Sequence, residues 1–196
     1  LISNTEFHGI SCVVAFGGGS VQDFSKRLCH IQYKRLVSVP TIISNDGLCS
    51  PIAVLLNDGN RKESLKGRPP DDLFIDIAFI TEAPAIYLKS AQGDLLTNLS
   101  ACNDWELARD RKLEPFSSYA YFLSKQSALD VLLFDGGLDR KDLIKRLVHC
   151  QLLSGEAMSI AGTSRPCSGS EHLISHAIDF LNYGKDILHG LQVASI

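Results

Sequence analysis

Short apolar runs separated by turn residues fill the first part of the chain, a pattern that predicts strands of an α/β domain. Residues 12–16 form a continuous apolar run that stops at three glycines, after which apolar residues recur at helical spacing up to Leu28. This order predicts a buried strand, a glycine turn and a helix. Residues 36–39 predict a second buried strand, which ends at Pro40.

A loop rich in hydroxyl and turn residues follows Pro40, and such loops after strands are where α/β proteins place ligands. Farther along, residues 52–56 and 64–65 flank the turn sequence at residues 57–60, which predicts a hairpin. Residues 73–77 are apolar and predict one more strand. The first part of the chain is therefore expected to form an α/β unit.

The pattern changes after residue 82, where strand signals disappear and apolar residues recur at helical spacing over long segments. The helices predicted there cover residues 94–113, 117–133, 139–160 and 168–183. Helix ends and short connections are indicated by Gly136, Gly137, Gly162 and Gly184. We therefore expect two domains, residues 1–82 and residues 83–196, of which the second is nearly all helical.

Composition and charge narrow the classes of partner. The chain has 196 residues, 45% of them hydrophobic, which is enough for a substantial core. Its net charge is -3, and its charges are spread out, so we expect no nucleic-acid partner and no membrane-surface patch. No apolar run approaches the roughly 20 residues of a membrane span, and the first residues do not resemble a secretory signal. A cytoplasmic protein that binds a small molecule is expected.

The glycine turn at Gly17, Gly18 and Gly19 is a candidate anion site. Free backbone amides and the dipole at a helix N-terminus favour a phosphate group, and the missing side chains let it approach closely. The turn matches neither G-x-G-x-x-G nor a P-loop, and it could equally be structural. Asp23 and Lys26 follow one helical turn apart and could form a surface ion pair of little energetic value.

Histidines near the C-terminus form a candidate metal site. His172 and His176 stand four residues apart on one predicted helix face, and His189 follows just before Gly190. Imidazoles joined by a carboxylate from another helix could hold zinc with an open position for a substrate, although they could also be ordinary helix histidines. The six cysteines form no close pair, so we expect reduced thiols that do not bind metal.

Spacing does not decide which of the 22 acidic residues would complete this site. Asp94 follows Gly93 at the start of a predicted helix, so it could be a metal ligand or a helix N-cap. Glu171 is the alternative, but it directly precedes His172 and is expected to point to a different face of the helix. On these grounds, Asp94 and Glu171 both remain candidates for the carboxylate ligand.

A family resemblance is carried by five segments in this order: GGGSVQDFSK, SVPTIISNDGLCSP, AQGDLLTNLSACNDWELA, SIAGTSRPCSGSEHLISHAID and LHGLQV. Together they resemble the glycerol-1-phosphate dehydrogenases of the dehydroquinate synthase and iron-containing alcohol dehydrogenase superfamily. The resemblance implies a partial nucleotide-binding α/β domain followed by an all-helical domain, with the active site between them. It also implies that N-terminal strands and C-terminal helices of the family lie outside this chain.

The resemblance assigns the metal ligands to Asp94, His172 and His189, and it places His176 beside the substrate. The metal would be one divalent cation. The resemblance implies zinc, although iron or nickel would also suit oxygen and nitrogen ligands. The sequence differs from the family pattern at two positions. Asn45 stands where the family commonly has histidine, and Leu191 stands where it commonly has glutamate. Neither departure removes an expected ligand.

An NAD or NADP cofactor is also implied by the resemblance. Its binding residues would be Gly17, Gly18, Gly19, Ser20, Asp23, Thr41, Ser44 and Asp46. The glycines and Ser20 would bind the pyrophosphate, while Asp46 would face both nicotinamide and substrate. Proton relay by Asp46 or His176 is expected from the same comparison.

The implied reaction interconverts sn-glycerol 1-phosphate and dihydroxyacetone phosphate by hydride transfer. The alternatives are a glycerol or alcohol dehydrogenase, a sugar-phosphate cyclase that uses NAD transiently, and a truncated module without activity. Candidates for binding the phosphate of a polyol phosphate substrate are Lys66, Arg165 and Ser168. Exposed helical faces in the second half would permit a homodimer.

Overall fold

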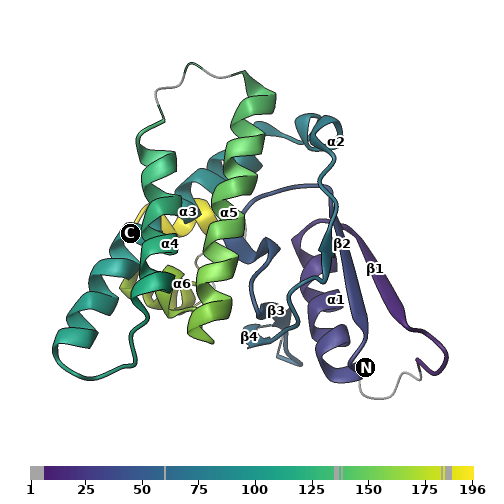
Figure 1. Cartoon of the computed structure of the whole chain (residues 1–196), viewed down its shortest axis with the longest axis horizontal. Coiled ribbons are helices and arrows are strands. Elements are labelled where there is room, and N and C mark those ends of the chain that lie inside the picture. The colour runs from purple at the N-terminus through teal and green to yellow at the C-terminus, as the bar shows by residue number, and fades with distance from the viewer. Residues whose placement is uncertain (1–6, 60, 135–136, 138, 182, 184–186) are drawn as a thin grey trace.

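The computed structural model describes residues 7–59, 61–134, 137, 139–181, 183 and 187–196. A small α/β part near the N-terminus lies beside a larger helical part (Figure 1). Within the described residues, no helix is both long and apolar enough to cross a membrane. Two glycines that indicated helix ends, Gly136 and Gly184, lie outside the described residues.

The α/β part contains a parallel sheet with the strand order β1-β2-β5. β1 (Cys12–Gly17) leads into α1 (Gly19–Gln32), and β2 (Arg35–Pro40) follows, so the predicted strand, glycine turn and helix are confirmed. β1 and β2 pair in parallel along their whole length. Because parallel strands end at the same edge of a sheet, the glycine turn and the loop after Pro40 lie side by side.

β5 (Asp72–Leu73) is much shorter than the strand predicted at residues 73–77, so that prediction is wrong beyond its first residue. The chain leaves the sheet because Asp76 caps α2 (Ile77–Thr81), its carboxylate accepting a hydrogen bond from the backbone N–H of Phe79. Apolar side chains of this run pack against the core of the helical part instead. The apolar run therefore marks a connection into a helix.

The predicted hairpin is confirmed. β3 (Ile52–Leu56) and β4 (Lys62–Lys66) pair antiparallel in a separate sheet. The side chain of Asn57 closes the turn by accepting hydrogen bonds from the backbone N–H groups of Gly59 and Arg61.

After residue 82, the described residues form the helices α3 (Ala85–Asp110), α4 (Ser118–Leu132), α5 (Arg140–Ala161), α6 (Ser170–Phe180) and α7 (His189–Val193). The predicted helices at residues 117–133, 139–160 and 168–183 are therefore confirmed to within a few residues. Ser117 and Asp139 cap α4 and α5 with their side chains, and Gly162 ends α5 with a φ of 68°.

α3 begins at Ala85, earlier than the helix predicted from residue 94. Asp94 therefore lies inside a helix and is not its N-cap, a position that Pro84 occupies. Gly93 suggested a helix start, but it serves a tertiary contact: a Cβ on Gly93 would lie 2.4 Å from the carbonyl oxygen of Gly190 in α7.

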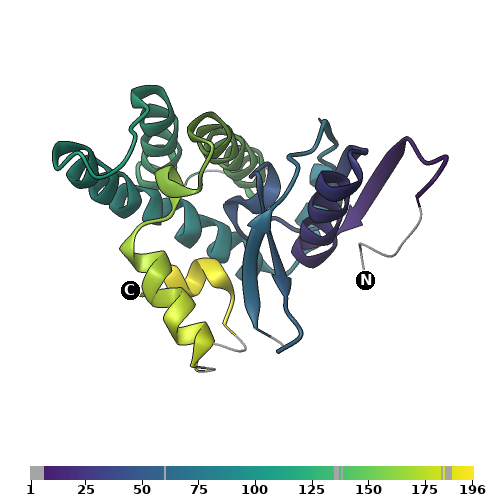
Figure 2. The ribbon, with the colours of Figure 1, turned by 90° about the horizontal axis from the view of Figure 1, so that it is seen from below.

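The core of the helical part also anchors the loop after β2. Ile43 from this loop belongs to the same buried cluster as Leu95 and Ile144. Figure 2 shows the hairpin of β3 and β4 between α1 and the segment that forms α6 and α7. The loop and the hairpin thus connect the two parts of the molecule, while a domain boundary at residue 82 stays a prediction.

Candidate metal and cofactor site

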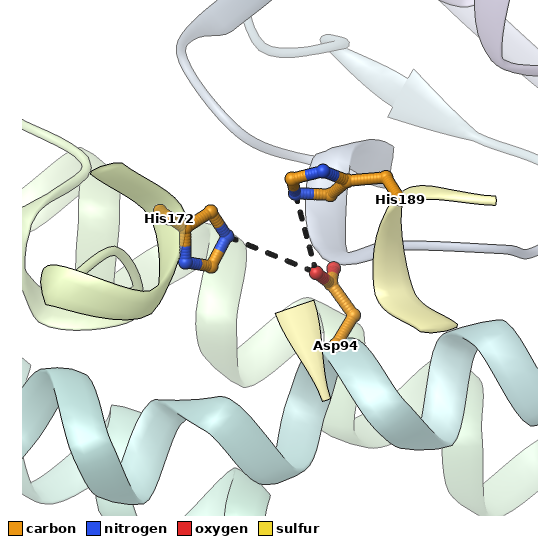
Figure 3. Close-up of side chains that lie close together, drawn as sticks. All are labelled: Asp94, His172 and His189. Carbon is orange, nitrogen blue, oxygen red and sulfur yellow. Dashed lines mark ion pairs between the residues drawn. The ribbon is translucent and has the colours of Figure 1, made fainter. Parts of the chain in front are cut away.

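A buried carboxylate forms the centre of the candidate metal site. The side chain of Asp94 is 1% exposed, and its Oδ2 accepts a hydrogen bond of 2.7 Å from the backbone N–H of Asp46. Its Oδ1 has no hydrogen-bond partner among the described residues. This oxygen lies 3.6 Å from Nε2 of His189 and 3.9 Å from Nε2 of His172 (Figure 3).

The spacing of these three side chains fits a bound cation. One ligand atom from each of Asp94, His172 and His189 lies within 4.8 Å of the other two. The carboxylate–imidazole distances are too long for hydrogen bonds. Ligand atoms about 2.0–2.2 Å from a tetrahedral zinc ion lie roughly 3.3–3.6 Å apart. A buried, unpaired carboxylate oxygen is costly without a positive charge, so this donor set could hold a divalent cation.

A second carboxylate orients the ring of His172. Oε1 of Glu171 lies 2.8 Å from Nδ1 of His172, which leaves Nε2 directed towards Asp94. As expected, Glu171 does not join the three clustered residues, although its contact with the ring of His172 was not predicted. In the first turn of α6 its carboxylate folds back and also accepts hydrogen bonds from the N–H of Gly169 and the hydroxyl of Ser100.

Burial and hydrogen bonding set the ionisation of this cluster. Burial lowers the pKa of His189 to about 4, with a further contribution from the neighbouring His172. Burial raises the pKa of Asp94. Although burial alone would raise it, hydrogen bonds from His172, Gly169 and Ser100 lower the pKa of Glu171 to about 2. A carboxylate whose charge is disfavoured, beside an imidazole that stays neutral, is suited to a metal ion.

Two glycines bring His189 next to Asp94. A Cβ on Gly190 would lie 1.9 Å from the carbonyl oxygen of Ser90 and 2.9 Å from Cβ of Asp94. Together with the close approach at Gly93, this allows α7 to pack directly on α3. Sequence spacing gave no sign of this contact, since the two helices are far apart along the chain.

The glycine turn has the backbone geometry that requires glycine. Gly17 has a φ of 156°, and a Cβ there would lie 2.8 Å from the side chain of Val21. A Cβ on Gly18 would lie 2.9 Å from Cδ1 of Ile42. α1 begins at Gly19, where a Cβ would meet open space, so an anion can approach the first amides of the helix.

A cleft brings several of the expected cofactor residues together. It is lined by Gly19, Gln22, Asp23, Pro40, Ile42, Ile43, Ser44, Asn45, Gly47, Leu48 and Gln151. Thr41 lies beside the turn and donates its backbone N–H to the carbonyl oxygen of Gly17 at 3.1 Å. Gly17, Gly18, Ser20, Thr41 and Asp46 do not line this cleft, although each is next to a residue that does or belongs to the same turn.

Three comparisons place the chain among known proteins. A family model described as iron-containing alcohol dehydrogenase matches residues 1–84. The chain is 41% identical over 195 residues to a glycerol-1-phosphate dehydrogenase (NAD(P)+) of Pyrococcus horikoshii, covering 98% of this chain and 56% of that protein. A protein of the same name from Hyperthermus butylicus is 38% identical over 99% of this chain and 56% of its own length. Residues 1–84 therefore resemble the iron-containing alcohol dehydrogenase family, and nearly the whole chain is similar to these glycerol-1-phosphate dehydrogenases. The chain spans little more than half the length of the curated relatives it matches.

Solved structures confirm the fold class. A probable glycerol dehydrogenase from Sinorhizobium meliloti superposes with a TM-score of 0.74 at 25% identity, covering 95% of this chain and 55% of that one. The glycerol dehydrogenase of Schizosaccharomyces pombe gives a TM-score of 0.74 at 19% identity, covering 98% of this chain and 51% of that one. The expected fold class, a partial α/β part with a helical part, agrees with these structures.

The two expected catalytic residues lie in different surroundings. Asp46 begins the short 3-10 helix η2 (Asp46–Leu48), directly beside Asp94. Burial and the charge of Asp94 raise the pKa of Asp46 to about 7. His176 is an exposed residue one turn beyond His172 on α6 and is not one of the three clustered ligands. Although the residue is exposed, partial desolvation of its ring lowers the pKa of His176, with the positive charge of His172 contributing.

Sequence reasoning missed the structural roles of two side chains beside the cleft. Nε2 of Gln22 donates to the carbonyl oxygens of Ala15 and Gly17, both at 3.1 Å, which ties α1 to the end of β1. Lys26 is 1% exposed, so the expected surface pair with Asp23 is wrong. Its Nζ lies 2.9 Å from Asp23 and donates to the carbonyl oxygen of Gly47 at 2.8 Å. Spacing of three residues cannot distinguish such a buried pair from an exposed one.

Proposed function

We propose that this chain supplies the metal- and nicotinamide-binding part of an NAD(P)-dependent glycerol-1-phosphate dehydrogenase. The reaction would interconvert sn-glycerol 1-phosphate and dihydroxyacetone phosphate by hydride transfer. The observation that carries the proposal is the buried, unpaired Oδ1 of Asp94 between the imidazoles of His172 and His189. The substrate is supported by the names of relatives that are about 40% identical over nearly the whole chain.

The metal would be held by Asp94, His172 and His189. Three ligands of oxygen and nitrogen leave a position open for substrate, and zinc is the preferred ion, with iron or nickel as alternatives. The bound cation would polarise the carbon–oxygen bond that changes oxidation state, and the nicotinamide would exchange the hydride. Glu171 would keep the ring of His172 in the orientation that directs Nε2 to the cation.

The cofactor would be NAD or NADP, with its pyrophosphate at the N-terminus of α1. Gly17, Gly18, Gly19 and Ser20 would let backbone amides reach the phosphate oxygens. Asp23, Thr41 and Ser44 would line the adjoining part of the cofactor site. The loop after β2 then leads from the cofactor directly to Asp46 and the metal ligands, because Asp46 donates its N–H to Asp94.

Proton transfer is assigned to Asp46 and His176. Asp46 lies beside Asp94, so its carboxyl group is positioned near the oxygen of the substrate that gains or loses a proton. His176 lies on α6 one turn beyond His172 and is exposed to an entering substrate. The proposal keeps the cytoplasmic location and the domain boundary at residue 82 that the sequence indicates, and a homodimer as a candidate assembly.

Metal analysis tests this proposal most directly. We expect about one equivalent of zinc, iron or nickel in the purified protein, lost in His172→Ala and retained in His176→Ala, which serves as the matched control. Oxidation of NADH or NADPH with dihydroxyacetone phosphate then tests the reaction. Correctly folded protein without metal would refute the site, whereas bound metal with turnover of dihydroxyacetone but not of its phosphate would favour a glycerol dehydrogenase.

A further inference from the structure

One face of α6 extends from the cluster of Asp94, His172 and His189 towards the hairpin of β3 and β4. His172, His176 and Asp179 lie at positions i, i+4 and i+7, so they share this face. With a rise of about 1.5 Å per residue, His176 lies about 6 Å and Asp179 about 10 Å along the helix axis from His172. A small molecule that binds at the cluster would extend along this row of side chains.

A lysine from the opposite part of the molecule meets the far end of this row. Nζ of Lys62, in β4, lies 2.8 Å from Oδ2 of Asp179. The neighbouring Arg61 stacks over the ring of Phe180 at 4.3 Å, so two consecutive hairpin residues contact the end of α6. Figure 2 shows the hairpin beside this helix. The Lys62 side chain is 42% exposed, which leaves its ammonium group accessible to a ligand.

Two other basic side chains among the described residues already have partners. Lys26 is buried and bonded to Gly47, and Arg165, an earlier phosphate candidate, pairs with Glu114 at 2.7 Å.

We propose that Lys62 binds the phosphate group of the substrate, and that Asp179 holds its ammonium group in place until the phosphate arrives. The inference rests on the proposed function, because it needs a phosphorylated substrate whose reacting oxygen lies at the cluster of Asp94, His172 and His189. A three-carbon phosphate extended from the cluster would pass His176 and reach Lys62. A phosphate dianion then replaces one carboxylate as the partner of the ammonium group.

The test compares dihydroxyacetone phosphate with unphosphorylated dihydroxyacetone in purified variants. Lys62→Met is expected to raise KM for the phosphate by about ten-fold or more, since a hydrogen bond to a charged group is lost. Its kcat, and kcat/KM for dihydroxyacetone, should stay within about two-fold. Lys62→Arg should keep the preference for the phosphate. Lys145→Met, which removes a surface lysine paired with Asp142, is the matched control.

Asp179→Asn separates phosphate binding from a merely structural ion pair. Removing the competing carboxylate frees Lys62, so KM for the phosphate should fall in this variant and rise in Lys62→Met. If the pair only joins the two parts of the molecule, both variants weaken both substrates alike, and the inference is overturned. Stabilisation by sn-glycerol 1-phosphate relative to glycerol, measured by thermal melting, gives a readout without turnover. A parent protein with full metal content but no preference for the phosphate would refute the proposed substrate class, and this inference with it.

Discussion

Replacing Gly190 by alanine tests how the proposed metal ligands are brought together. The added Cβ would lie 1.9 Å from the carbonyl oxygen of Ser90 and 2.9 Å from Cβ of Asp94. Both neighbours belong to α3 and cannot rotate away, because one is backbone and the other is fixed to it. α7 must therefore move away from α3 and carry His189 with it.

The required movement exceeds what a metal site tolerates. Carbon and oxygen atoms that are not bonded need a separation of about 3 Å or more, so α7 must shift by at least about 1 Å. Metal–ligand distances tolerate only about 0.2 Å. We expect Gly190→Ala to lower metal affinity at least as much as the loss of an orienting contact does, which is about 10–100-fold. Overpacking should also cost about 1–3 kcal/mol of folding free energy.

Metal titration against a competing chelator, with thermal melting on the same samples, measures both effects. Gly19→Ala is the matched control, because a Cβ on Gly19 meets no atom within 4 Å and the residue lies outside the metal cluster. Its metal affinity and melting temperature should equal those of the parent protein or rise slightly. Unchanged metal affinity in Gly190→Ala would refute the reasoning, since it would show that close packing of α7 on α3 does not position His189.

Three further perturbations test other parts of the site. Glu171→Gln should lower metal affinity by about 10–100-fold without unfolding the protein, because an orienting carboxylate is lost; equilibrium dialysis against zinc measures this. Lys26→Met should cost on the order of 3 kcal/mol in denaturant unfolding, because it leaves Gly47 and a carboxylate without their buried partner. Burial raises the pKa of Cys29 to about 11 and the pKa of Cys150 to about 12, so both thiols should resist a disulfide reagent at pH 8 until the protein is unfolded. Rapid modification of either cysteine in the native protein would contradict the described packing.

The sequence pattern correctly predicted those parts of the fold that depend on residues close together along the chain. The strand, glycine turn and helix around Gly17 follow from an apolar run, a backbone that needs glycine, and helical spacing. Caps at Ser117 and Asp139 likewise mark helix starts that the structure has. The start of α3 was missed because Gly93 is an unusual residue inside a helix, and its reason is the contact with Gly190. That reason is tertiary, so no local pattern reports it.

The candidate metal site shows the same limit. Spacing paired His172 with His176, because residues four apart share a helix face. The structure instead pairs His172 with His189, on a different helix, and with Asp94 on a third. Only the family resemblance named these three residues, since it carries tertiary information that spacing lacks. The hydrogen bond between Glu171 and His172 was not predicted, because spacing along a helix does not report that a first-turn glutamate can fold back.

The two oxygens of Asp94 explain why the proposed cofactor loop and the proposed metal ligands lie together. Oδ2 accepts the backbone N–H of Asp46, so the loop after β2 fixes the rotation of the carboxylate and leaves Oδ1 facing the imidazoles. The hydroxyl of Ser90 donates to the carbonyl oxygen of Ser44 at 2.8 Å, which holds the same loop against α3 one turn earlier. A shift of this loop would therefore turn the carboxylate as well as reshape the cofactor cleft. The position of the loop thus sets both the cleft that would receive the cofactor and the oxygen that would receive the cation.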